Sequence, residues 1–120
     1  APTVGYSTGP SGPHLHRLFA QWGIVDELAP RILVAPPGVA VAALMPRGDI
    51  ALGFQQLREF AGVDGIDAVG LLPPEIQMVT TFSGGIATTS SRRDDARIVL
   101  DVMAAPAVAG IKRTHGMEPA

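Results

Sequence analysis

Short apolar runs alternate with helical patterns along the first half of the chain, and this alternation restricts the possible folds more than any other feature. The runs cover residues 3–6, 31–35 and 50–54, and each is followed by proline, glycine or polar residues. The connections between the runs are too long for hairpins, so the strands are predicted to be parallel. The sequence therefore predicts an α/β fold, with a mostly parallel sheet and flanking helices.

The first connection contains the clearest helical pattern. Pro13 suits the first position of a helix, and Gly23 suits the left-handed residue just past its end. A second, wholly apolar helix is expected over residues 38–45. In the first helix, four apolar residues fall on one face, which is expected to pack on the sheet: Leu15, Leu18, Phe19 and Trp22.

Composition narrows the function classes. The chain has 120 residues, of which 47% are hydrophobic and 17% charged, so one packed core is expected rather than disorder. A net charge of −2 without a basic stripe argues against nucleic acid as a partner. The absence of cysteine excludes disulfides, thiolate metal sites and a cysteine nucleophile, but leaves the compartment open.

The second half of the sequence predicts further strands and a helical end. A strand is expected over residues 66–71, and an extended segment over 78–82 leads into a helical C-terminal third. Ser91 and Asp94 have the spacing of a capping box, and Pro106 is expected to start a last helix. The helix after Ser91 carries an apolar face made of Ile98, Val99, Val102 and Met103.

A loop rich in hydroxyl groups and glycine, residues 7–13, leads from the first strand into the first helix. The first N–H groups of a helix lack intrahelical partners and carry a partial positive charge, so they attract anions. The hydroxyls of Ser7, Thr8 and Ser11, with the amide of Gly12, are therefore predicted to bind an anion or another hydrogen-bond acceptor. The alternative is that Ser11 only caps the helix and the glycines only make the turn.

Two amides follow the third strand, at the sheet edge where α/β proteins bind ligands. Gln55 and Gln56 can each donate and accept hydrogen bonds, although they could equally begin an ordinary polar loop. Val39 stands at the start of the second predicted helix, which ends at the same crevice. Unpaired backbone amides at two helix starts, around Gly12 and Val39, are thus expected to converge on one ligand.

The sequence offers little for catalysis or metal binding. Residues 5–9 match the G-x-S-x-G pattern of serine hydrolases, with Asp101 and His115 following in order, but the prolines after Ser7 delay the helix that this motif requires. No acid–base pair is visible. His14 and His16 would lie roughly 200° apart on a helix and cannot chelate one ion. No catalytic residue, metal site or cofactor is predicted, and the protein is expected not to be an enzyme.

Several segments together resemble the molybdate-type solute-binding proteins of ABC transporters, which have the type 2 periplasmic-binding fold. The likeness extends over the whole chain, which corresponds to the second half of such a protein. The segments that carry the resemblance are residues 5–12, 18–19, 23–24, 35–39, 47–54 and 112–117.

The resemblance implies a domain organisation. Residues 1–77 would form a ligand-binding α/β lobe, and residues 78–120 a hinge strand and C-terminal helices that pack on a first lobe outside this sequence. Family ligand contacts correspond to Ser11, Gly12 and Val39. Gln56 stands where the family has a tyrosine, so the implied ligand is a small oxyanion or an organic carboxylate rather than molybdate in particular.

The resemblance also implies a role and partners. The expected function is non-catalytic binding of a small anion in the periplasm or outside the cell, with an ABC permease as partner. An N-terminus without methionine or a leader fits either a removed signal peptide or a fragment. A homodimer, domain-swapped through residues 78–82, is expected because the apolar helix face would otherwise be exposed. The alternatives are the effector lobe of a transcription regulator and a small serine hydrolase.

Overall fold

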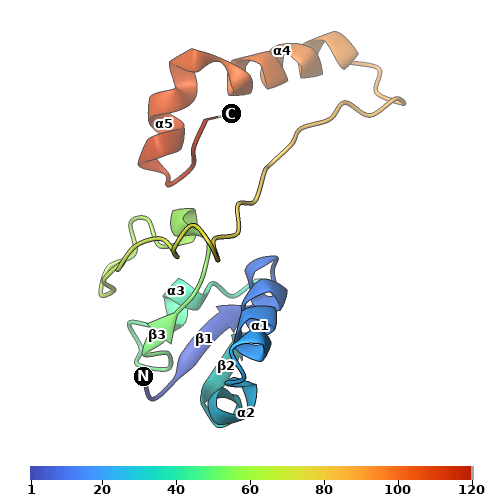
Figure 1. Cartoon of the computed structure of the whole chain (residues 1–120). Coiled ribbons are helices and arrows are strands. Elements are labelled where there is room, and N and C mark those ends of the chain that lie inside the picture. Colours follow the sequence, from blue (N-terminus) through green and yellow to red (C-terminus); the bar gives the residue numbers. More distant parts are fainter. Residues whose placement is uncertain (120) are drawn as a thin grey trace. The chain divides into compact units, whose positions relative to one another are not determined.

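The computed structural model describes residues 1–119, which divide into one unit up to Val79 and a second from Thr80 onward. Within the described residues, the first unit contains a parallel sheet with the strand order β2-β1-β3 (Figure 1). The strands are β1 (Val4–Ser7), β2 (Ile32–Ala35) and β3 (Leu52–Gly53). The predicted α/β class is confirmed, and the small open sheet with flanking helices is compatible with one lobe of a periplasmic-binding fold.

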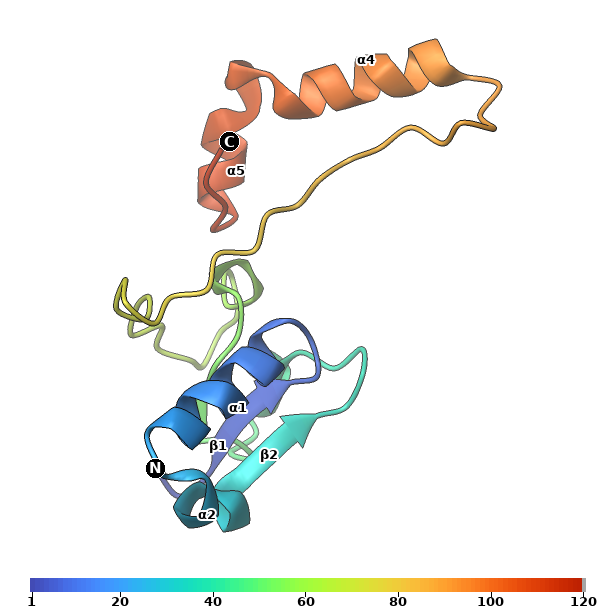
Figure 2. The same ribbon diagram turned by 45° about the vertical axis from the view of Figure 1, so that its right-hand side comes forward.

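Helices form both crossover connections of the sheet. The first connection holds α1 (Ser11–Gln21), α2 (Val25–Leu28) and the 3-10 turn η1 (Ala29–Arg31), and Figure 2 shows α1 lying along β1 and β2. The second holds α3 (Val41–Leu44). Since β1 is central, the chain runs from it to the edge strand β2 and then crosses to β3 at the opposite edge.

The two faces of the sheet are covered by separate apolar clusters. Successive strand residues point to opposite faces, so Ile32 packs on one cluster and its neighbour Leu33 on the other. The first cluster joins β1 to α1 through Val4, Tyr6, Leu15 and Phe19, and the second consists of Ala35, Val41 and Ile50. The predicted apolar stripe of the first helix is thus the sheet-facing side of α1, except that Trp22 is half exposed, at 51%.

Two predictions for this unit are too long. The second helix covers only residues 41–44 because the preceding residues form a turn, in which the Val39 N–H donates to the Pro36 carbonyl. The third strand is shorter than residues 50–54, and it is not buried on both faces, since Leu52 is 40% exposed. Gly23, by contrast, follows α1 with φ 68°, as predicted.

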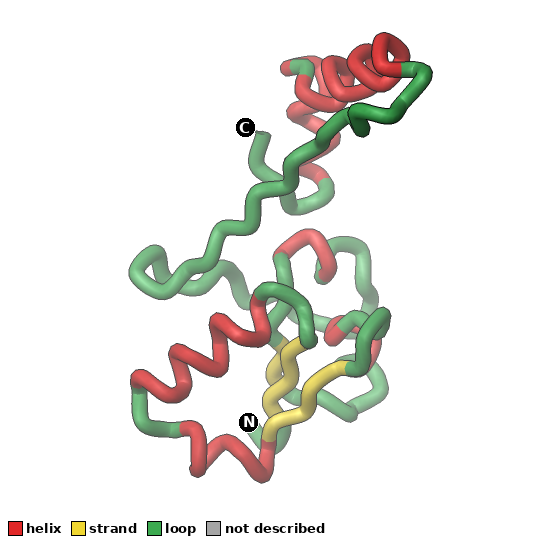
Figure 3. Tube along the Cα trace, turned by 90° about the vertical axis from the view of Figure 1, so that its right-hand side faces the viewer, coloured by secondary structure: helices red, strands yellow, loops and turns green. Residues whose placement is uncertain are grey.

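The rest of the first unit is mostly loop (Figure 3). Its one short helical element is the 3-10 turn η2 (Leu57–Glu59), which follows β3. Residues 66–71 form no strand, and Val69 is 92% exposed, so this segment has neither ladder partner nor apolar cover. Close to the end of the unit, His14 of α1 donates from Nε2 to the Ile76 carbonyl at 2.8 Å, which ties this loop to the helix.

The second unit holds α4 (Arg93–Ala104), the 3-10 turn η3 (Pro106–Val108) and α5 (Ala109–Thr114). The restart at Pro106 is confirmed, whereas the strand over 78–82 is absent and the capping box is wrong: no side chain caps α4. The predicted apolar face of α4 is 57–62% exposed. Within residues 1–119, no helix combines the length and apolar character that a membrane crossing requires.

Candidate functional site

A pocket of about 520 Å³ lies in the first unit, at the carboxyl ends of the strands. Its walls come from the loop after β1, the turn after β2 and the segment after β3. The lining residues are Ser7, Thr8, Gly9, Pro36, Pro37, Gly38, Val39, Ala40, Gln55 and Glu59.

Strand order explains why a pocket forms here. The connection after β1 runs to one neighbouring strand, and β3 later pairs on the opposite side. Because α1 packs on one face of the sheet and α3 on the other, the loops after β1 and β2 leave toward opposite faces, and open α/β sheets bind ligands where connections diverge in this way. Ser7 is the last residue of β1, so its side chain stands at the point of divergence.

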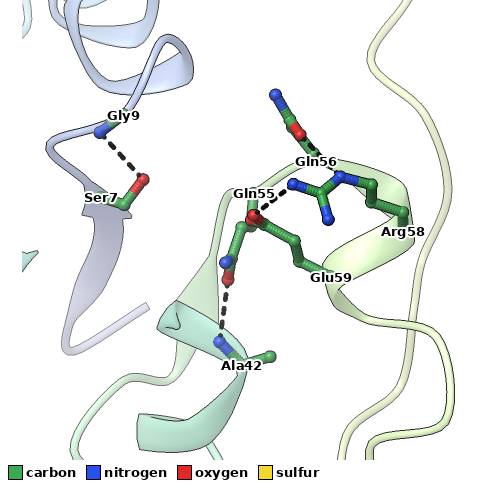
Figure 4. Close-up of polar contacts among 7 residues, drawn as sticks. All are labelled: Ser7, Gly9, Ala42, Gln55, Gln56, Arg58 and Glu59. Carbon is green, nitrogen blue, oxygen red and sulfur yellow. Dashed lines mark hydrogen bonds and ion pairs between the residues drawn. The ribbon is translucent and has the colours of Figure 1, made fainter. Parts of the chain in front are cut away.

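Hydroxyl groups supply the wall at the end of β1. The Gly9 N–H donates to Ser7 Oγ at 3.3 Å, which folds the loop back over the strand end (Figure 4). A serine hydroxyl that accepts one hydrogen bond still carries its own O–H donor. Thr8, the next residue, is exposed and also lines the pocket. Two hydroxyls can therefore donate to an acceptor bound here.

Backbone amides contribute less than predicted. The Gly12 N–H donates to the Gly9 carbonyl, and the Val39 N–H donates to the Pro36 carbonyl, both at 3.0 Å. Gly38 has φ 80°, the left-handed conformation that the third residue of this four-residue turn requires. The expectation of unpaired amides at Gly12 and Val39 is wrong, because local turns use both groups.

Gln55 joins the segment after β3 to α3. Its Oε1 accepts a hydrogen bond from the Ala42 N–H at 3.0 Å, within the first turn of that helix (Figure 4). The bond fixes the orientation of the side-chain amide, which also carries two N–H donors. Gln55 is partly buried and lines the pocket, so it can present donors to a ligand oxygen.

Arg58, in η2, contacts the side chains of Gln56 and Glu59. Arg58 donates from Nε to Gln56 Oε1 at 3.1 Å and from Nη2 to Glu59 Oε1 at 3.3 Å (Figure 4). Glu59 is the ionisable residue among those that line the pocket. The ion pair partly offsets the negative charge of Glu59.

Four of the seven predicted site residues line this pocket: Ser7, Thr8, Val39 and Gln55. Ser11, Gly12 and Gln56 are not among the lining residues. Sequence reasoning missed Glu59, since nothing in its spacing marks a residue in a loop after the third strand. In residues 1–119, no group of three or more His, Asp or Glu side chains could hold a metal ion.

The first unit is an α/β fold compatible with one lobe of a periplasmic-binding protein, with a pocket at the carboxyl ends of its strands. Residues 3–118 match the family described as bacterial extracellular solute-binding protein, and the chain belongs to that family. Family membership supports ligand binding in a transport-related context, which confirms the coarser part of the predicted function. No solved structure matches the chain.

A curated relative adds a correction. The chain is 34% identical, over 99% of its length, to an aconitate isomerase from a Pseudomonas species, and it spans 45% of that protein. This relative is an enzyme by name, so the expectation that the protein is not an enzyme is overturned. That expectation rested on the lack of an acid–base pair in the sequence, but the fold brings one carboxylate, Glu59, to the pocket wall. A single positioned carboxylate is sufficient for proton transfer.

Proposed function

We propose that the pocket at the carboxyl ends of the strands binds a small organic carboxylate. The observation that carries this proposal is the convergence of Ser7, Thr8 and Gln55, from two separate segments, on one pocket. All three side chains can donate hydrogen bonds, as carboxylate oxygens require. In keeping with the extracellular family, the protein would bind this ligand in the periplasm or outside the cell and deliver it to an ABC permease.

Pocket size favours an organic ligand over molybdate. A volume of about 520 Å³ lies within the range of roughly 300–1,000 Å³ that is common for organic ligands, and a tetrahedral oxyanion would fill a small part of it. The name of the relative points in the same direction, because aconitate is a tricarboxylate. We therefore propose di- and tricarboxylates as the ligand class.

Titration calorimetry on the full chain tests this proposal. We expect trans-aconitate and citrate to bind more tightly than molybdate or sulfate. A matched variant pair, Thr8→Val and Thr88→Val, separates the pocket from the surface, since Thr88 lies in the second unit. Equal binding of all four anions, or binding that Thr8→Val leaves unchanged, would contradict the proposal.

Isomerisation of an unsaturated carboxylate is a second candidate function. Two observations favour it: the enzyme named among the relatives, and Glu59 at the pocket wall. A carboxylate in that position could take a proton from a methylene group and return one as the double bond shifts. Proton NMR of cis-aconitate incubated with the chain would detect the trans isomer. Formation of that isomer at the rate of the uncatalysed control would refute this candidate.

A further inference from the structure

We propose that Arg58 recognises the carboxylate of the ligand, and that Glu59 holds Arg58 until the ligand replaces it. This inference rests on the proposed carboxylate function and adds a specificity residue to it. Neither residue stands out in the sequence, and Arg58 is not itself among the lining residues. The argument comes from the contacts of the segment after β3.

The geometry places the guanidinium one ion pair away from the pocket. Arg58 Nη2 lies 3.3 Å from Glu59 Oε1, and Glu59 lines the pocket. On its other side, Arg58 Nε donates to Gln56 Oε1 at 3.1 Å, so the guanidinium is held between the two side chains (Figure 4). Rotation of the arginine side chain toward the pocket would exchange the Glu59 carboxylate for that of the ligand.

The ion pair has the properties of a replaceable contact. Strong guanidinium–carboxylate bonds are about 2.7–2.9 Å long and often bidentate, whereas the described Arg58–Glu59 contact measures 3.3 Å. The two side chains are 40% and 28% exposed, so water screens the pair and its net stabilisation is small. A ligand carboxylate that meets the guanidinium with two oxygens would form the stronger interaction.

Charge gives an independent reason for the exchange. An anion that enters the pocket approaches Glu59, and like charges repel each other. Arg58, which pairs with Glu59, carries the positive charge that can offset this repulsion. An arginine that turns toward the ligand would therefore strengthen carboxylate binding in a pocket that Glu59 lines. That movement also releases the Glu59 carboxylate at the pocket wall.

Two variants change ligand affinity in opposite directions if the exchange occurs. Arg58→Gln removes a charge-assisted contact, so trans-aconitate should bind roughly tenfold to a hundredfold more weakly. Glu59→Gln removes the competing carboxylate, so trans-aconitate should bind several-fold more tightly. Arg58→Lys keeps the charge but loses the bidentate geometry, and we expect an affinity between those of the wild type and Arg58→Gln.

The double variant separates exchange from simple repulsion. If Glu59 acts by holding Arg58, the gain from Glu59→Gln disappears in the Arg58→Gln background. If Glu59 only repels the ligand, the gain stays the same in both backgrounds, and the proposal is wrong. The matched controls are Arg47→Gln and Asp49→Asn, since this pair has a similar separation of 3.2 Å and lies outside the pocket lining.

Titration calorimetry of the full chain with trans-aconitate provides the readout, and Trp22 fluorescence confirms that each variant is folded. Wild-type binding that Arg58→Gln and Arg58→Lys leave unchanged would overturn the role of Arg58 while the proposed function stands. A wild-type chain that binds no carboxylate would overturn the proposed function and this inference with it. Should Arg58→Gln fail to fold, the double-variant comparison is made in the Arg58→Lys background, where exchange predicts a smaller gain from Glu59→Gln and simple repulsion predicts an unchanged one.

Discussion

Replacing Gly12 by alanine tests how the first helix is seated on the sheet. A Cβ atom built on Gly12 would collide with the backbone carbonyl oxygen of Ser7, and it would lie 3.3 Å from the Tyr6 ring. The carbonyl belongs to β1 and cannot rotate away, so α1 must shift. Overpacking costs about 1–3 kcal/mol, and a collision with a fixed backbone atom belongs in the upper part of that range, about 2–3 kcal/mol. Helix propensity alone would predict the opposite sign, because alanine is favoured over glycine by up to about 1 kcal/mol.

The net loss of about 1–2 kcal/mol corresponds to a fall in the melting temperature of the first unit of roughly 4–16 °C. The chain has one tryptophan, Trp22, whose ring centroid lies 6.3 Å from that of Phe19, so its fluorescence follows this unit. Ala20→Gly, at an exposed position of α1, is the control for propensity and should cost about 1 kcal/mol. A Gly12→Ala chain that is as stable as the wild type, or more so, would refute the close approach of α1 to β1.

Three further predictions concern the site, the core and the surface. Ser7→Ala should weaken binding of trans-aconitate by roughly twofold to tenfold, the usual worth of one hydrogen bond, as measured by calorimetry; an unchanged affinity would remove Ser7 from the site. Ile50→Val should destabilise the first unit by about 0.5–1.5 kcal/mol in urea titrations, because Ile50 is only 2% exposed, and no loss would mean that its cluster is loosely packed. We also predict that the chain dimerises through the exposed apolar face of α4, so Val102→Asp should lower the mass measured by light scattering, and a monomeric wild type at high concentration would argue against this.

The sequence predicts the sheet and its first helix because their signals are local. Apolar residues at helical spacing identify the buried face of α1, and the alternation of runs and connections predicts parallel strands, as the pairing of β1 with β2 and β3 confirms, although it does not predict their order. The positions of Ser7 and Gln55 at strand ends follow from that topology. These elements can be predicted without knowing which distant residues are in contact.

Other parts depend on contacts that sequence patterns do not contain. Residues 66–71 have the apolar character of a strand, yet no partner strand lies beside them. The segment before α3 forms a turn through Gly38, so Val39 is not at the start of a helix. Glu59 lines the pocket from the 3-10 turn η2, and a single carboxylate in a short turn carries no sequence pattern of its own.

Amide chemical-shift mapping of the ¹⁵N-labelled chain during titration with trans-aconitate tests the central claim most directly, since it shows which residues sense the ligand. The account predicts saturable shifts at Thr8, Gly9 and Gly38, and at the side-chain amide of Gln55, with smaller changes in the second unit. Shifts confined to residues beyond Thr80, or no shifts at a concentration of carboxylate that saturates calorimetric binding, would contradict it.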